Sequence, residues 1–165
     1  MEGSVVLCDY AQVHAGKLYV VGGGVNLAIT QDLEPPHQIN LYAAILITVP
    51  WTAHNQAHTL VVSLLHEDGK KIELGRPLPG AQPPPEEYRG SIVGRFNAGR
   101  SPIMRAGDES VMPLVVPLIL GVPKLDEYRL DVQIDGSSIA SAKFRVINAQ
   151  DAGMSVVGLP GSQLG

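Results

Sequence analysis

Cysteine, aromatic residues and clustered positive charge are all scarce in this chain of 165 residues. Cys8 is the single cysteine, so no intramolecular disulfide can form, which fits a reducing compartment. Lysine and arginine number 12 against 16 aspartates and glutamates, and Lys70-Lys71 is the densest basic pair. Because phosphate recognition needs a basic stripe, we expect neither nucleic acid nor an anionic membrane surface as a partner.

Long apolar runs are missing as well. The longest, from Val111 to Pro123, is shorter than a membrane span and contains three prolines. The first residues lack the basic segment of a signal peptide, and Asp9 ends the apolar run that begins at Val5. We therefore expect a soluble, cytoplasmic protein.

Helical patterning is nearly absent, because no window of a dozen residues places apolar side chains at helical spacing without glycine or proline. Segments of alternating polarity recur instead, and hydrophobic residues make up 45% of the chain, enough for a core. This predicts an all-β fold: a two-layer, mostly antiparallel β-sandwich of seven to nine strands with immunoglobulin-like or jelly-roll connections. The domain should span residues 1–148, and residues 149–165 should form an irregular tail.

The strongest strand signals come in pairs. Residues 128–134 alternate apolar and polar side chains, Asp135-Gly136 turns the chain, and residues 140–146 return. Residues 58–66 and 71–74 form a second predicted hairpin around a turn at 67–70. Residues 39–49 are apolar at both parities, which predicts a central strand that is covered on both faces.

The segment 112–120 predicts a protected edge strand. Successive N–H groups of a strand point to opposite edges, and Pro113 and Pro117 have the same parity. Both missing donors therefore lie on one edge, which cannot pair normally. The core face of this strand would be formed by Met112, Leu114, Val116, Leu118 and Leu120.

Two segments, one rich in glycine and one rich in proline, could serve either in binding or only as connections between strands. The triplet Gly22-Gly23-Gly24 lacks the spacing of a dinucleotide-binding loop, because Leu27 occupies the last glycine position, so a turn is expected. The Pro-rich segment 76–85 fits a stiff connector better than a polyproline ligand for another protein.

Residues that could carry chemistry do not converge in the sequence. His54 and His58 have the spacing of a helical metal site but lie outside a helix, and His58 and His66 would be about 26 Å apart along one strand. Cys8 lies in an apolar strand, where a buried, inert thiol is expected. The loop carboxylates, Asp126 and Glu127 among them, are expected to be solvated. We expect no catalytic centre, no metal and no cofactor.

The opening of the chain resembles a known family. Residues 7–13 read Leu-Cys-Asp-Tyr-Ala-Gln-Val, and residues 16–23 read Gly-Lys-Leu-Tyr-Val-Val-Gly-Gly. This pattern, with the central apolar strand and the two hairpins, resembles a family of small bacterial, often actinobacterial, domains of unknown function. The likeness covers residues 4–147 and implies a β-sandwich, with no activity, ligand or catalytic residue attached.

These observations predict a non-catalytic cytoplasmic binding or adaptor module. The alternative is a self-assembling structural subunit, and a third possibility is a sandwich that binds a sugar or another small molecule by stacking on Trp51 and Tyr88. A two-layer sandwich covers only one face of the strand at 39–49, so the other face, with Tyr42, Ala44 and Leu46, is the predicted protein contact. The predicted partner is another protein or, most simply, a second copy in a homodimer.

Overall fold

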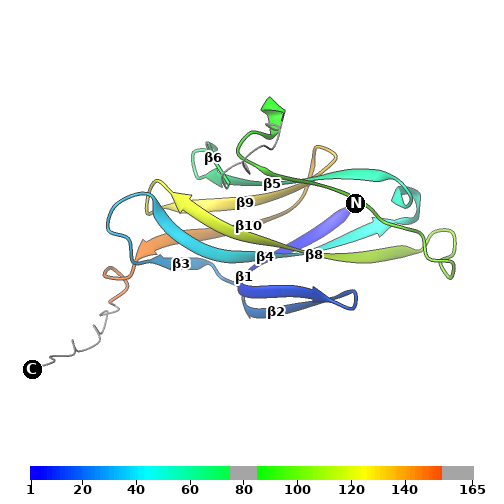
Figure 1. The fold of residues 1–165 in the computed structure, drawn as a ribbon, viewed down its shortest axis with the longest axis horizontal. Helices are drawn as coiled ribbons and strands as arrows, with labels where there is room; N and C mark the ends of the chain where they lie inside the picture. The colour runs from blue at the N-terminus through cyan, green and yellow to red at the C-terminus, as the bar shows by residue number, and fades with distance from the viewer. Residues whose placement is uncertain (75–84, 154–165) are drawn as a thin grey trace, which may run out of the picture.

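Ten strands and two short 3-10 helices are present in the computed structural model, which describes residues 1–74 and 85–153 (Figure 1). The elements are β1 (Glu2–His14), β2 (Lys17–Gly23), β3 (Leu27–Thr30), β4 (His37–Pro50), η1 (Trp51–Ala53), β5 (Ala57–His66), β6 (Lys71–Ile72), η2 (Glu86–Tyr88), β7 (Ile92–Asn97), β8 (Glu109–Val122), β9 (Glu127–Ile134) and β10 (Ser137–Asn148).

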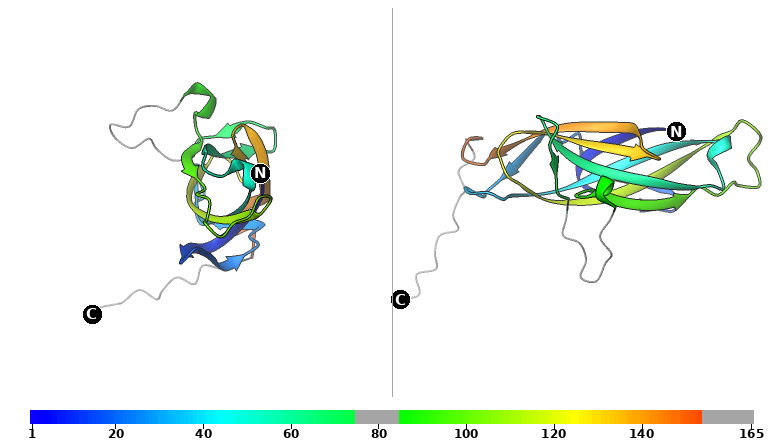
Figure 2. Two further views of the ribbon diagram at one scale, coloured as in Figure 1. Left: turned by 90° about the vertical axis from the view of Figure 1, so that its right-hand side faces the viewer. Right: turned by 90° about the horizontal axis from the view of Figure 1, so that it is seen from above.

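The strands form two sheets that pack together as a sandwich. Sheet A has the order β2-β1-β4-β8 and is antiparallel throughout. Sheet B has the order β3-β10-β9-β5-β6, and β7 pairs with β5 beside β6. Figure 2 shows the sheets surrounding a common interior, with the β1–β2 hairpin outside it. The predicted all-β sandwich is confirmed.

The core lies between the sheets and is built by alternation along the strands. From sheet A, the odd-numbered residues of β4 enter it, and from sheet B, the even-numbered residues of β9 do so. Its fully buried side chains include Ile45, Ile47, Leu64, Leu130 and Val132. The core is therefore the one that the alternating pattern predicts.

Strand β4 is central and β8 is an edge strand, as predicted. β4 pairs with β1 along one side and with β8 along its full length on the other. Among the described strands, β8 has no partner beyond β4, so Pro113 and Pro117 fit at the free edge of sheet A. Leu118 and Leu120 are buried in the core, and Met112, Leu114 and Val116 pack partly buried against it.

Two tight turns set the hairpins. Ala15 and Gly16 have φ values of 48° and 71°, and Asp135 and Gly136 have φ values of 50° and 80°. Positive φ at both central residues is typical of the two-residue turn whose twist matches that of paired strands. The turn predicted at Asp135-Gly136 is thus present.

Three points differ from the predictions or extend them. The described residues contain ten strands rather than seven to nine. The strand predicted at 71–74 is present as β6 but is only two residues long. β3 pairs in parallel with β10, a contact between distant segments that local alternation does not predict. The Pro-rich segment 76–85, apart from its last residue, and the tail beyond Gly153 lie outside the described residues.

Among the described residues, no helix has the length and apolar character needed to cross a membrane.

Candidate functional site

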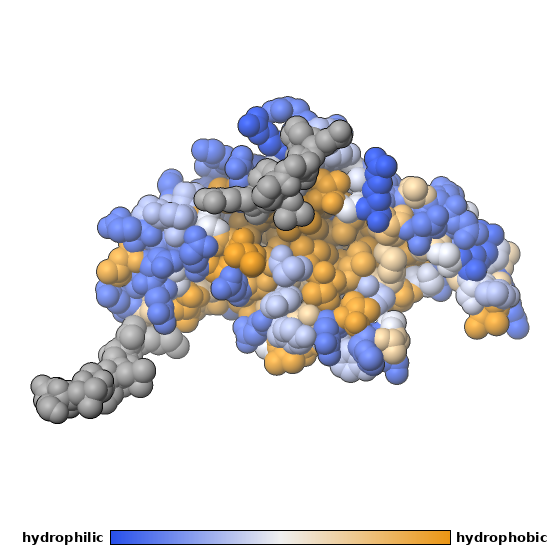
Figure 3. Space-filling view, in the orientation of Figure 1, coloured by the Kyte–Doolittle hydropathy of each residue, from blue (hydrophilic) through white to orange (hydrophobic). Residues whose placement is uncertain are grey.

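Large apolar side chains are exposed on the β1–β2 hairpin. Every residue of β2 except Leu18 is exposed, although four consecutive residues of this strand are hydrophobic. The hairpin surface, as we define it, contains Val6 (41% exposed), Tyr10 (45%), Val13 (43%), Tyr19 (47%), Val20 (41%) and Val21 (61%). Orange residues along the lower edge of Figure 3 mark apolar groups in this part of the molecule.

The hairpin itself covers part of the outer face of sheet A. Cys8, Ala11 and Ala44 are buried together in a small cluster, and Leu18, Tyr42 and Val115 pack against it. Ala44 is therefore 2% exposed, although its side chain points away from the main core. The outer face of the apolar strand β4 is thus covered in part by the β1–β2 hairpin of the same chain. The prediction that Ala44 offers a free contact is wrong.

The two other predicted contact residues remain closer to solvent. Tyr42 is half-buried and lies edge-on to Tyr10, with ring centroids 5.3 Å apart. Leu46 is 37% exposed between Ser4 of β1 and Pro113 of β8. Their role in contacting a partner stays a prediction.

Cys8 is fully buried on this face, beneath the hairpin. Its thiol approaches the carbonyl oxygen of Tyr42 at 3.5 Å. Burial raises the pKa of the Cys8 thiol, and the charge of Asp9 adds to this effect. A protonated, enclosed thiol is a poor nucleophile, as expected from the sequence.

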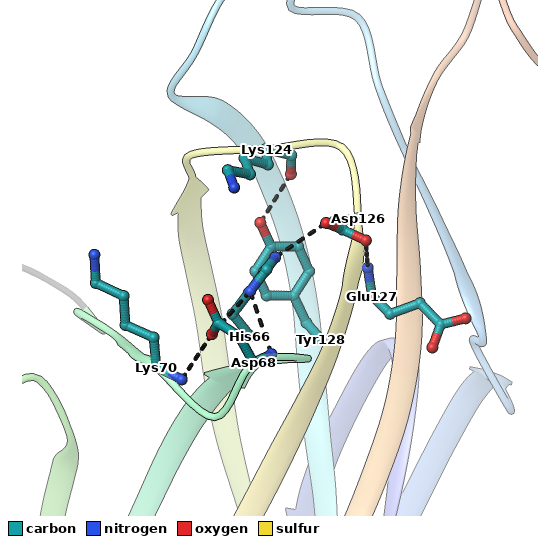
Figure 4. Close-up of polar contacts among 7 residues, drawn as sticks. All are labelled: His66, Asp68, Lys70, Lys124, Asp126, Glu127 and Tyr128. Atoms are coloured by element: carbon teal, nitrogen blue, oxygen red, sulfur yellow. Dashed lines mark hydrogen bonds and ion pairs between the residues drawn. The ribbon is translucent and has the colours of Figure 1, made fainter.

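A polar cluster closes one end of sheet B (Figure 4). It is centred on His66, which ends β5 and is 8% exposed. Its Nδ1 lies 2.9 Å from Oδ1 of Asp68 in the following turn, and its Nε2 lies 3.1 Å from Oδ2 of Asp126, the residue just before β9. The ring packs edge-on against Tyr128, with ring centroids 5.5 Å apart.

Electrostatics favour a charged His66. The hydrogen bond with Asp68, supported by the one with Asp126, raises the pKa of His66 against the opposing effect of burial. The pKa of Asp68 is lowered, mainly by the hydrogen bond from the backbone N–H of Lys70 and next by the one from His66. The pKa of Asp126 is lowered in the same way by the backbone N–H of Glu127 and by His66. The His66 ring, with a carboxylate at each nitrogen, ties the β5–β6 turn to the β8–β9 connection.

The same cluster is the only group in residues 1–74 and 85–153 with metal-ligand spacing. The ligand atoms of His66, Glu67 and Asp126 lie within 4.8 Å of one another. Both nitrogens of His66 already have carboxylate partners, so a metal would have to displace the proton on Nε2. The adjoining cavity, of about 140 Å³, is smaller than the pockets that hold organic ligands.

A larger groove of about 580 Å³ lies between β3 and β4. It carries two carboxylates, Asp9 and Asp32. The carboxylate of Asp32 accepts hydrogen bonds from the N–H of Gln38 at 2.7 Å and the hydroxyl of Thr30 at 3.3 Å. Oδ2 of Asp32 is therefore already engaged by neighbouring groups of the fold.

His58 forms a second buried histidine–carboxylate pair at the other end of β5. Its Nδ1 lies 2.7 Å from Oδ2 of Asp135, and its Nε2 lies 2.8 Å from the carbonyl oxygen of Ala53. Both partners are acceptors, so both ring nitrogens must donate. Burial opposes the charged ring, but the bonds to Ala53 and Asp135 together outweigh it and raise the pKa of His58.

This pair gives a testable pH dependence of stability. The folded pKa of His58 lies above the unfolded value of about 6.5, so its contribution is complete below that value and is lost as the pH rises through the folded pKa. We expect the free energy of unfolding of wild type to exceed that of His58→Gln most at about pH 6 and least at about pH 8. Urea denaturation of both proteins measures this difference. A difference that does not change with pH would contradict a charged His58.

The residues predicted to stack on a ligand lie in separate elements. Trp51 lies in η1 at the end of β4, and the guanidinium carbon of Arg100 sits 3.7 Å from its ring centroid. Tyr88 lies in η2, which Figure 1 shows above β5 and away from η1. One face of the indole is thus occupied by the chain's own arginine, and the two rings do not form one platform.

Comparison with known proteins identifies the family. Residues 3–147 match a family of unknown function, DUF6941. The chain belongs to this family. No curated protein matches the DUF6941 chain. A β-glucuronidase from glycoside hydrolase family 2 is 14% identical and has a TM-score of 0.34, with 70% of the DUF6941 chain and 10% of the enzyme covered. The chain spans about a tenth of that enzyme's length, and a likeness at this level carries no argument.

The sequence interpretation of this DUF6941 domain missed the carboxylate partners of its histidines. His66 and Asp126 are 60 residues apart, and His58 and Asp135 are 77 apart. A signal was available: each carboxylate lies at one end of the strand 127–134, and each histidine lies at one end of 57–66. Antiparallel pairing of these two strands places the end groups together.

Proposed function

We propose that the chain is a non-catalytic, cytoplasmic protein-binding or adaptor module, and that it binds its partner through the hairpin surface. The observation that carries this proposal is the set of exposed apolar side chains on β1 and β2, among which Tyr10 lies directly opposite Val21. Exposed apolar patches on folded domains mark interaction sites more often than chance, because exposure of such a patch to water is unfavourable.

The arrangement of polar groups supports a non-catalytic role. The histidine–carboxylate pairs at His58 and His66 are directed at neighbouring turns and strands, where they act as cross-links within the fold. No buried side-chain nitrogen or oxygen in the described part of the chain lacks a hydrogen-bond partner. A preorganised reaction centre commonly holds such groups ready for a substrate.

Site-specific photo-cross-linking in the cell of origin tests this surface. A benzophenone amino acid at Val21, which is 61% exposed, should form covalent adducts with a partner protein. The matched control is the same amino acid at Lys143, an exposed residue of β10 in sheet B. We expect adducts from position 21 and none from position 143. Adducts from position 143 alone would place the binding surface elsewhere and overturn the proposal.

A self-assembling structural subunit is the second candidate. The observation that favours it is the lack of a partner on the outer edge of β2 in the described structure. The mass of the photo-adduct separates the two candidates: a doubled chain mass indicates self-assembly, and any other mass indicates a different protein.

A further inference from the structure

The two edges of sheet A differ sharply in how they are protected. At the β8 edge, Pro113 and Pro117 lack the N–H groups that a neighbouring strand would need. At the β2 edge, the strand Lys17–Gly23 contains no proline and a single charged residue, Lys17. Its hydrophobic residues Tyr19, Val20 and Val21 are all more than 40% exposed. An exposed apolar edge strand is a template for pairing with another strand.

We propose that β2 pairs antiparallel with β2 of a second copy of the chain, with Val20 opposite Val20. This inference rests on the proposed function, because it takes part of the hairpin surface as the contact and names its partner. The four-stranded sheets of the two copies would then form one continuous sheet across a twofold axis.

The direction of the backbone N–H and C=O groups of β2 supports a twofold axis at Val20. The two-residue turn at Ala15-Gly16 pairs His14 with Lys17, and such a turn directs the N–H of its last residue back to the first strand. Alternation then directs the N–H and C=O groups of Lys17, Tyr19 and Val21 toward β1. Those of Leu18 and Val20 point to the free edge. Residues that both point outward can exchange two hydrogen bonds when they lie opposite each other.

The side chains are self-complementary in the same register. With Val20 on the twofold axis, Tyr19 lies opposite Val21 of the other copy, and aromatic–β-branched pairs stabilise antiparallel sheets. Lys17 lies opposite Gly23, so the one charged residue of the strand never meets its own copy. A second copy therefore fits this edge without like-charge repulsion.

Cysteine cross-linking tests the register directly. Directly opposite residues that share two hydrogen bonds have Cα atoms about 5.5 Å apart, which a disulfide can bridge. We expect Val20→Cys to give mostly disulfide-linked dimer under mild oxidation. Tyr19→Cys is the matched control, because residue 19 lies diagonally from its own copy, at more than the roughly 7 Å that a disulfide can span. The wild-type protein controls for Cys8, which is fully buried. Equal cross-linking of the two variants would overturn the proposed register.

Light scattering at micromolar concentration tests the edge contact itself. Val20→Pro removes an outward N–H and leaves the groups that face β1 intact, so it should convert a dimer to a folded monomer. A dimer that persists in Val20→Pro would overturn edge pairing. A monomeric wild type would also overturn it, while adducts of another protein at Val21 would keep the proposed function. If the protein neither pairs with itself nor forms adducts at Val21, both proposals are wrong.

Discussion

Tyr128→Ala is expected to destabilise the domain by about 3–5 kcal/mol, which is the cost of removing a large aromatic side chain from a packed core. Tyr128 is 1% exposed and lies between His66 and Phe144, with ring centroids 5.5 Å and 5.9 Å away. Its hydroxyl donates a hydrogen bond to the carbonyl oxygen of Lys124 at 2.8 Å. Loss of the ring therefore leaves a cavity and also frees the end of the β8–β9 connection. Denaturant unfolding followed by circular dichroism measures the change.

Tyr128→Phe separates the two contributions. It keeps the ring and removes only the hydroxyl, so we expect a loss of about 0.5–1.5 kcal/mol. If the phenylalanine and alanine variants were equally unstable, the hydrogen bond to Lys124 would carry the whole effect, and the packing role of the ring would be wrong.

Ile45→Lys is expected to prevent folding, while Leu46→Lys should change stability by only about 0.5 kcal/mol. The residues are neighbours on β4, but Ile45 is fully buried in the main core and Leu46 is 37% exposed on the outer face of sheet A. An unpaired ammonium in the core has neither water nor a carboxylate to stabilise its charge. Circular dichroism and denaturant unfolding of the purified variants check both expectations.

A contrary result would be informative about the outer face. If Leu46→Lys also destabilised the domain by several kcal/mol, then the region around Leu46 would be covered more completely than its exposure indicates. A loss that depended on protein concentration would point to a partner copy over this residue, as the sequence analysis predicted for Tyr42, Ala44 and Leu46.

Local patterns were sufficient for the strands and for most of the core. The alternation in residues 128–134 determines which side chains enter the core, because a shift by one residue would expose all of them. The prolines at 113 and 117 were enough to place β8 at an edge. Both inferences depend only on the two-residue period of a strand.

Contacts between distant segments could not be predicted in the same way. Ala44 and Ala11 share a cluster because the β1–β2 hairpin folds over sheet A, and no period in either segment encodes that bend. The Asp126 carboxylate was expected to be solvated, since its contact with His66, 60 positions earlier, follows only once the strands 57–66 and 127–134 are known to pair. Both contacts depend on how the elements are arranged after the strands have paired.

The prolines of β8 also limit how large an assembly can become. A sheet that grows into a fibril needs an available edge on both sides, so that each added chain offers a new site for the next one. Here Pro113 and Pro117 block one edge of sheet A, and a pair joined through β2 would use the other. Growth along sheet A would then stop at two chains, which protects an apolar edge strand against open-ended polymerisation.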